Sequence, residues 1–217
     1  ARGSSFRTIF SFWGISNYTR YMMDLPSFRY QRFMLWFRKA STALAMDPSK
    51  WDENTKLPKS ARRDLRSLLN DIARPRGAVP LTQKDHAVVY TDASDSGGGF
   101  VVCDPASISR GWRWTEKQLM DYPHIHQKEA VALVSGVYAA MEMCQNGSQI
   151  TAMVDNTVVD ACWRRKGARD PILANILNEL QLALEERKML LITRWIPTDR
   201  NIADSLSRIF SGKTQRQ

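Results

Sequence analysis

Apolar residues follow a helical period in the first third of the chain and a strand-like period after residue 86. Between residues 6 and 46, spacings of three and four recur, as in Phe33, Trp36 and Phe37. This period predicts helices, and Pro26 is expected to separate two of them because proline lacks the N–H that a helix interior needs. The aromatic rings are expected to form a core, and the alternative is that rings interleaved with arginine stack bases and hold phosphates.

The segment 47–58 is rich in Pro, Asp and Lys and is expected to form a loop. A helix is expected next, with Ser60 as its N-terminal cap, and it should end before a linker at Arg74–Gly77. The residues expected on the buried face of this helix are Leu65, Leu68, Leu69 and Ile72.

After residue 86, short apolar runs alternate with turns and with longer helical patterns. The short connections among the first three runs predict an antiparallel meander. The whole order of three strands, a helix, a strand, two helices, a strand and a helix predicts a mixed α/β sheet. The expected strands are Val88–Asp92, Phe100–Cys103, Ser109–Thr115, Ile150–Asp155 and Met189–Ile196, and the expected helices are His126–Met143, Thr157–Arg165, Pro171–Arg187 and Asn201–Phe210.

The net charge of +9 belongs entirely to the N-terminal part of the chain. Residues 1–90 hold 16 Lys/Arg and 7 Asp/Glu, whereas residues 91–217 hold 15 of each. A basic segment joined to a neutral one suits a protein that holds a polyanion on one part and processes it on the other. The alternative is a basic surface that is simply solvated.

Several features bear on the cellular compartment. No apolar run approaches the length of about 18 residues that a transmembrane helix needs, so no membrane partner is expected. The three cysteines, Cys103, Cys144 and Cys162, lack metal-ligand spacing and are expected to be reduced and buried in an intracellular protein. Residues 1–5 contain neither an initiator Met nor an apolar signal segment, so we expect a non-secreted piece of a longer polypeptide.

Four acids stand out in the second part of the chain. Asp92 and Asp155 each end an apolar strand, Glu129 lies at the edge of the apolar stripe of its helix, and Asp204 lies among Ile202, Ala203 and Leu206. A carboxylate buried at the end of a strand is costly unless a cation compensates it, and no Lys or Arg partner is evident beside these four. Capping of the next helix is the alternative role for Asp155, and an ordinary helix-start acid is the alternative for Asp204.

Other charged residues near these acids are expected to be solvated. Asp95 lies in the Ser94–Gly97 turn and is expected to be a turn former. Lys128 and Glu142 are expected to point away from the buried side of their helix.

A parallel pairing of the strands that carry Asp92 and Asp155 would place both carboxylates at one edge of the sheet. Hard divalent cations, Mg²⁺ or Mn²⁺, take carboxylate oxygens as ligands. Two such ions about 4 Å apart can clamp a phosphoryl displacement, one helping to activate water and the other stabilising the leaving 3′ oxygen. No Ser/His/Asp triad, P-loop or dinucleotide-binding glycine motif competes with this interpretation.

Four sequence blocks resemble the ribonuclease H domain of retroelement polymerases, and DIRS-like and gypsy-like elements are the most similar. The blocks are Thr91–Ser94, His124–Glu129, Val154–Asn156 and Asn201–Arg208, they occur in the order of the family, and together they span about residues 86–210. The resemblance implies a ribonuclease H-like fold, a five-stranded mixed sheet in the order 3-2-1-4-5 flanked by helices.

The resemblance also implies an activity and a site. The activity is hydrolysis of the RNA strand of RNA/DNA hybrids, which leaves a 5′ phosphate and a 3′ hydroxyl. Carried over by motif, Asp92, Glu129, Asp155 and Asp204 are the catalytic and metal-binding tetrad, with two Mg²⁺ ions as cofactors for which Mn²⁺ can substitute. The residues assigned as nucleic-acid contacts are Ser94, Asn156, Arg194, Arg200 and Asn201.

The N-terminal part is similar to the end of a reverse transcriptase. Gly14–Tyr18 and Ala61–Leu65 carry this likeness to a thumb or connection region, and the catalytic Asp-Asp motif of the polymerase is absent, so no polymerisation is expected. We therefore expect a basic, mainly helical segment at 1–80, a ribonuclease H-like domain at 81–212 and a tail at 213–217. The implied partners are an RNA/DNA hybrid and the reverse transcriptase part of the same polyprotein, in a cytoplasmic or nuclear retroelement particle.

The chain departs from the family in one loop. Many relatives place a histidine before the last aspartate, and Thr193–Arg200 contains none, so Arg194 or Arg200 is expected to contact phosphate instead and turnover is expected to be slower. His124 and His126 are expected to serve helix entry and packing. The alternative function is a non-catalytic module of the same fold that binds nucleic acid or scaffolds a ribonucleoprotein, and a third interpretation is a nuclease of the same fold with another substrate.

Overall fold

The structure is a computed structural model, and it describes residues 3–74, 86–104 and 107–210. The chain divides into two compact units, Ala1–Ala78 and Val79–Gln217, which are described separately below. The predicted tail at 213–217 and all of the predicted linker except Arg74 lie outside the described residues.

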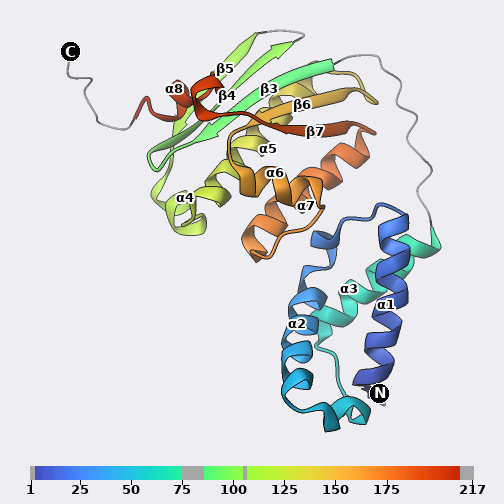
Figure 1. Ribbon diagram of the computed structural model, residues 1–217. Helices are drawn as coiled ribbons and strands as arrows, with labels where there is room; N and C mark the ends of the chain where they lie inside the picture. The colour runs from blue at the N-terminus through green and yellow to red at the C-terminus, as the bar shows by residue number, and fades with distance from the viewer. Residues whose placement is uncertain (1–2, 75–85, 105–106, 211–217) are drawn as a thin grey trace. The chain divides into compact units, whose positions relative to one another are not determined.

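The first unit is helical, as the apolar period predicts (Figure 1). Its helices are α1 (Phe6–Met22), α2 (Gln31–Met46) and α3 (Lys59–Ala73), and Pro26 lies between the first two. Short regular pieces join them: η1 (Ser27–Tyr30) precedes α2, η2 (Pro48–Asp52) follows it, and β1 (Ser4–Ser5) pairs with β2 (Asn54–Thr55). The segment 47–58, expected to be a loop, therefore contains η2 and β2.

Aromatic and aliphatic side chains from all three helices form the core of this unit. The core includes Trp13, Phe33 and Leu68, each at most 5% exposed. The rings of Trp13 and Phe33 lie 4.9 Å apart and are tilted, a favourable arrangement for two aromatic groups. Most of the aromatic residues noted in the sequence therefore pack against one another inside the unit.

Two details of the predicted third helix are wrong. The helix begins at Lys59 after an extended Pro58, with no side-chain cap, so Ser60 lies inside its first turn. Leu69 is 46% exposed, because an advance of about 100° per residue carries it off the stripe that buries Leu68.

The second unit contains one mixed sheet of five strands. The strands are β3 (His86–Ala93), β4 (Gly97–Asp104), β5 (Ile108–Arg113), β6 (Gln149–Val154) and β7 (Leu190–Trp195), in the order β5-β4-β3-β6-β7. The first three strands pair antiparallel, whereas β3, β6 and β7 pair parallel. Counted along the chain, this is the order 3-2-1-4-5, so the predicted fold class is confirmed.

Helices cover both faces of this sheet. The helix α5 (Ile125–Met143) packs on β3 and β4 and contacts α7 (Pro171–Glu186), and α6 (Thr157–Arg164) contacts β7. The short α8 (Asp204–Ser207) lies across β3, β4 and β5 on the opposite face from α5 (Figure 1). None of the helices in the described ranges is long and apolar enough to cross a membrane.

The structure differs from the sequence prediction at two helices of this unit. A six-residue helix, α4 (Glu116–Asp121), was not predicted; a capping box between Thr115 and Gln118 starts it. The last helix is far shorter than the predicted 201–210, because Asn201 lies in an extended conformation and its side chain is bonded to β3.

Among the described residues the three cysteines are free thiols, as expected. Cys144 is buried and Cys162 is half-buried, but Cys103 is exposed near the end of β4, so the prediction of burial is wrong for Cys103.

Candidate metal centre

Parallel pairing of β3 and β6 brings two of the predicted acids together. In this register Thr91 lies opposite Val154, so the next residue on each strand, Asp92 or Asp155, lies at the same edge of the sheet. Asp92 is only 3% exposed, and Asp155 is half-buried. The predicted parallel pairing is therefore correct, and it follows from the helical crossover that joins the two strands.

The third acid comes from α5. This helix can approach the sheet closely because Gly136 has no side chain: a Cβ there would lie 2.8 Å from Thr91 Cγ2 and from Val89 Cγ2. The approach carries Glu129, which is 7% exposed, to the strand ends. Ligand oxygens of Asp92, Glu129 and Asp155 all lie within 4.8 Å of one another.

Asp204 lies beside this group of three but is engaged elsewhere. Its Oδ1 accepts hydrogen bonds from Arg208 Nε at 2.9 Å and Arg208 Nη2 at 2.7 Å. The expectation that all four acids lack a basic partner is therefore wrong for Asp204. The two residues are one helical turn apart, a spacing at which oppositely charged side chains meet.

Burial and mutual repulsion make the cluster costly to ionise. Burial raises the pKa of Asp92 from 3.8 to about 6; a Ser207 hydrogen bond opposes this increase, and the charges of Asp155 and Asp204 add to it. Burial also raises the pKa of Glu129 well above 4.5, with further increases from Asp92 and Asp155. The charge of Arg208 acts in the other direction and lowers the pKa of Asp92.

Bare backbone and two polar side chains hold the C-terminal segment against the sheet. A Cβ on Gly99 would lie 2.5 Å from Leu206 Cβ, so α8 packs directly on the backbone of β4. Ser94 Oγ donates to Ser207 O at 2.7 Å, and Asn201 Nδ2 donates to Thr91 O at 2.9 Å. These bonds fix the backbone on both sides of Asp204 relative to the end of β3.

The five residues assigned as nucleic-acid contacts fall into two groups. Ser94 and the buried Asn201 make the internal bonds just described, and Asn156 Oδ1 accepts from Val158 N and Val159 N as the cap of α6. Asn156, and not Asp155, is therefore the capping residue. Arg194 and Arg200 are exposed, and their role stays a prediction.

Arg194 lies on the same face of the sheet as Asp92. Tyr90 is paired with Met153, and Met153 with Arg194, so these three residues form a row across β3, β6 and β7. Side chains alternate along a strand, so Tyr90 and Asp92 point to the same face, and the row shares it. Arg194 thus stands about two strand spacings, roughly 10 Å, from the strand that carries Asp92.

Lys128 differs from its prediction. It is 5% exposed rather than solvated, and its Nζ lies 3.0 Å from Asp95 Oδ1. The Asp95 side chain is 96% exposed, as expected for a turn residue. The ion pair joins the turn after β3 to the first turns of α5, because a lysine stem can lie buried while its charge reaches a carboxylate at the surface.

The two histidines noted before Glu129 occupy the start of α5. His124 is the N-cap residue, and its backbone N–H donates to Gln127 Oε1 at 3.1 Å. His126 Nε2 lies 2.8 Å from Asp170 Oδ2, which connects α5 to the start of α7. These positions are those of helix entry and packing.

Two residues at the site have no role predicted from the sequence. Trp195 is 51% exposed at the end of β7, and its indole N–H donates to Asp155 O at 2.9 Å. Arg208, the partner of Asp204, lies in the last of the four sequence blocks, but no contact was predicted for it. An aromatic residue at a strand end and an arginine four residues after an acid were the available signals.

The chemistry of the cluster suits divalent cations. Asp92, Glu129 and Asp155 form no salt bridge with any described residue, although two of them are buried. Carboxylate oxygens are the ligands that Mg²⁺ and Mn²⁺ prefer, and a bound cation would remove the repulsion that raises the pKa of Asp92 and of Glu129. The residues present therefore fit a divalent metal.

No protein-family profile and no curated protein matches the sequence. Solved structures with a similar fold include the N-terminal RNase H domain of Rv2228c from Mycobacterium tuberculosis, at 21% identity over 57% of this chain and 91% of that chain, with a TM-score of 0.43. RNase H1 from the archaeon Halobacterium salinarum has 19% identity over 56% of this chain and 92% of its own, with a TM-score of 0.42. The protease-reverse transcriptase of prototype foamy virus has 13% identity over 93% of this chain and 26% of its own, with a TM-score of 0.38.

Proposed function

We propose that this chain is a metal-dependent endonuclease that cuts the RNA strand of RNA/DNA hybrids, as the ribonuclease H domain of a retroelement reverse transcriptase. The products are a 5′ phosphate and a 3′ hydroxyl, and two Mg²⁺ ions, or Mn²⁺ in their place, are the proposed cofactors. The observation that carries the proposal is the convergence of Asp92, Glu129 and Asp155 from three separate elements, within 4.8 Å and without a basic partner among the described residues.

The three carboxylates are the proposed cation ligands. Bound Mg²⁺ or Mn²⁺ would supply electrostatic stabilisation of the charge that develops on phosphoryl oxygens. In this proposal Asp204 would give up its hydrogen bond to Arg208 and complete the tetrad. Arg208 lies close enough to Asp92 to lower the pKa of Asp92. Asn201 and Ser207 act as positioning residues, because each ties the Asp204 segment to the end of β3.

Recognition of the hybrid is proposed to use the exposed arginines near the site. Arg194 shares a sheet face with Asp92, and Arg200 lies in the exposed η3 segment (Thr198–Arg200) before Asp204. Guanidinium groups form paired hydrogen bonds with phosphate, so each arginine can hold the backbone of one strand. Discrimination of RNA from DNA requires contacts with the 2′ hydroxyl. The motif assigns such contacts to Ser94, Asn156 and Asn201, and each would have to exchange an internal hydrogen bond of the structure to make one.

The test is cleavage of a labelled RNA/DNA hybrid by the full chain in Mg²⁺, Mn²⁺ or EDTA, compared with Asp155→Asn. We expect metal-dependent cutting of the RNA strand, which the variant loses by more than about a hundredfold, since metal charge stabilisation is worth several kcal/mol. Binding of Mn²⁺ measured by calorimetry should weaken in the same variant.

Asp199→Asn is the matched control, because it makes the same change at an exposed aspartate outside the cluster. It should cut the hybrid at the parental rate. Full activity in Asp155→Asn would refute the site. An absence of cutting together with salt-sensitive hybrid binding would favour the non-catalytic module instead.

A further inference from the structure

The exposed face of α3 carries four cations in two helical turns. Lys59, Arg62, Arg63 and Arg66 are all exposed. Their spacings of three and four place them on one face, opposite the buried Ala61 and Leu68. At about 1.5 Å per residue, the four charges occupy roughly 10 Å of helix length. We call these four residues the α3 basic stripe.

The acids of α3 do not neutralise this stripe. Asp64 faces the core, where its Oδ2 accepts from Arg32 N at 2.8 Å and Phe33 N at 3.0 Å. Asp71 accepts from Tyr30 Oη at 2.7 Å and lies 3.5 Å from Arg29. Across the described ranges, no carboxylate lies within salt-bridge distance of the four stripe residues.

The arrangement is unfavourable for the helix by itself. Lys59 and Arg63, and likewise Arg62 and Arg66, are like charges four residues apart, a spacing at which they repel and destabilise a helix. Most surface helices relieve such repulsion with interspersed acids. A bound polyanion would relieve it here.

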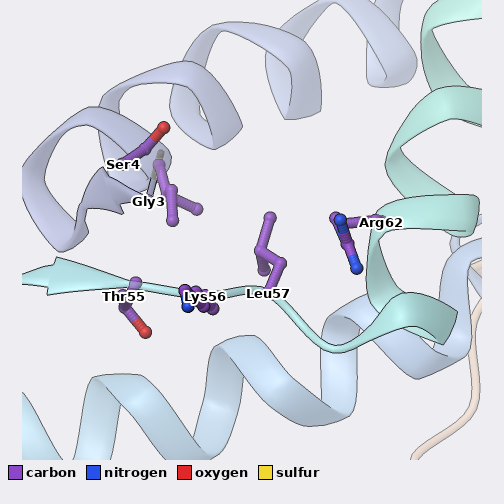
Figure 2. A pocket seen from close by; sticks show the side chains of 7 residues that line it. Gly3, Ser4, Thr55, Lys56, Leu57 and Arg62 are labelled. Carbon is purple, nitrogen blue, oxygen red and sulfur yellow. The ribbon is translucent and has the colours of Figure 1, made fainter. Parts of the chain in front are cut away.

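A pocket continues the basic surface beside the first turn of α3. Its volume is about 260 Å³, and Figure 2 shows Lys56, Leu57 and Arg62 among the side chains that line it. Of the seven lining residues, Lys56 and Arg62 are cations and none is an acid. Lys56 and Arg62 therefore add positive charge to this pocket beside the α3 basic stripe.

From this surface we infer that the first unit is a nucleic-acid-binding module whose α3 basic stripe holds the phosphate backbone of a duplex. Closely spaced cations without base-reading groups match an electrostatic, sequence-independent contact. No residue of the α3 basic stripe belongs to the acidic cluster. The inferred binding by α3 therefore does not depend on whether the second unit cuts its substrate.

The test measures binding of the full chain to fluorescent RNA/DNA and DNA/DNA duplexes in EDTA, across a series of salt concentrations. The stripe variant combines Lys59→Gln, Arg62→Gln, Arg63→Gln and Arg66→Gln. Each lost phosphate contact reduces the slope of log K against log salt by about 0.9, so we expect a slope that is smaller by about 3 to 4 and affinity more than about tenfold lower at low salt.

A control variant removes the same number of exposed charges from the same unit, away from the stripe. It combines Arg32→Gln, Arg38→Gln, Lys39→Gln and Lys50→Gln, all at exposed positions. We expect this variant to keep the parental slope within about 1. Thermal unfolding should show that the stripe variant is folded, because its substitutions remove repulsion.

Equal losses in both variants would overturn the inference, since they would indicate a general charge effect. A parental slope in the stripe variant would overturn it as well, as would a stripe-dependent affinity for anionic lipid vesicles in place of duplexes. Cleavage measured at saturating hybrid concentration separates the two proposals. The stripe variant should still cut the hybrid under this condition. If the parental chain binds duplexes through the stripe but does not cut them, only the proposed nuclease activity is contradicted.

Discussion

At the scale of single residues, the acidic cluster concentrates unfavourable charge in a place where the fold excludes water. Asp92 is 3% exposed, and its neighbours Asp155 and Asp204 both raise its pKa. Repulsion of this kind is useful when a divalent cation is the intended partner, because the cation binding energy exceeds the cost of assembling the ligands. The metal-free and metal-bound chains should therefore respond in opposite ways to the same substitution.

Asp92→Asn should stabilise the metal-free chain at neutral pH. The pKa of Asp92 is raised to about 6 in the folded state, so the folded chain loses stability as the pH rises from about 4 through about 6. The variant removes that loss, which amounts to about 3 kcal/mol above pH 7 at 1.36 kcal/mol per unit. Urea unfolding in EDTA at pH 4 and pH 7.5 measures it, and the difference between the two proteins should vanish at pH 4.

The same comparison in excess Mg²⁺ should change sign. A ligand at 1,000 times its Kd stabilises the protein that binds it by about 4.1 kcal/mol, which exceeds the roughly 3 kcal/mol that the substitution contributes in EDTA. The parent should gain this stabilisation and Asp92→Asn should gain little. Equal gains in both proteins would contradict metal binding at this cluster.

Arg208→Gln should strengthen binding of a divalent cation. The Arg208 guanidinium pairs with Asp204 and acts on the pKa of Asp92, so its removal leaves the cluster more negative and frees a fourth carboxylate. Coulomb's law at surface dielectric values gives an increase in Mn²⁺ affinity of about three- to tenfold. Calorimetric titration with Mn²⁺ measures this affinity.

Arg164→Gln is the matched control for that titration. Arg164 also pairs with an aspartate four residues away, Asp160 at 3.3 Å. Its removal should leave Mn²⁺ affinity unchanged within about twofold. An equal increase in both variants would mean that net charge alone determines the affinity.

At the scale of elements, the position of α8 depends on glycine rather than on its own length. Four residues are too few for a stable isolated helix, so α8 is held by its contacts with the sheet. Gly99 allows Leu206 to touch the backbone of β4, and the bonds from Ser94 and Asn201 fasten the chain on either side. The position of Asp204 is therefore determined by residues more than 100 positions earlier in the chain.

Gly99→Ala should displace α8 and destabilise the second unit. The new Cβ would meet Leu206 Cβ at 2.5 Å and the Leu206 backbone at 3.1 Å, and overpacking of this kind costs about 1–3 kcal/mol. Chemical denaturation measures the cost, and hybrid cleavage should fall with it.

Gly14→Ala is the contrasting substitution. Gly14 lies inside α1, and a Cβ at this position would have nothing within 4 Å, so alanine should stabilise the first unit by about 0.5–1 kcal/mol. A loss of stability in Gly14→Ala, or none in Gly99→Ala, would contradict the packing described for these positions.

At the scale of the whole molecule, each unit has its own core. The first unit buries residues of α1, α2 and α3, and the second buries strand residues such as Val89 and Ala152 beneath α5. A chain with two cores can divide its work, with net positive charge in one unit and the acidic cluster in the other.

A fragment of residues 79–217 should fold alone and keep the proposed activity. We expect a cooperative thermal transition, kcat within about threefold of the full chain, and KM raised more than about tenfold because the α3 basic stripe is missing. Steady-state hybrid cleavage at two salt concentrations checks this. A KM equal to that of the full chain would contradict the inferred role of the first unit.

The sequence by itself determined which segments become strands and which acids end them, whereas the order of the strands was implied by the resemblance to the ribonuclease H family. Apolar runs such as Val88–Tyr90 mark the strands, and the short connections among the first three strands predict antiparallel pairing. Given parallel pairing of the two strands, which the structure shows, Asp92 and Asp155 lie at one edge of the sheet. Their role as metal ligands stays a proposal.

Only the tertiary structure decided which side chains meet across the chain. Periodicity states which face a residue occupies but not which residue of another element lies opposite it. For that reason the bond of Asn201 to Thr91, the burial of Lys128 against Asp95 and the bond of Trp195 to Asp155 were not predicted. Contacts of this kind depend on how closely helices approach the sheet. Gly99 and Gly136 allow a close approach because they have no side chain, and the residues that pack against them are distant in the sequence.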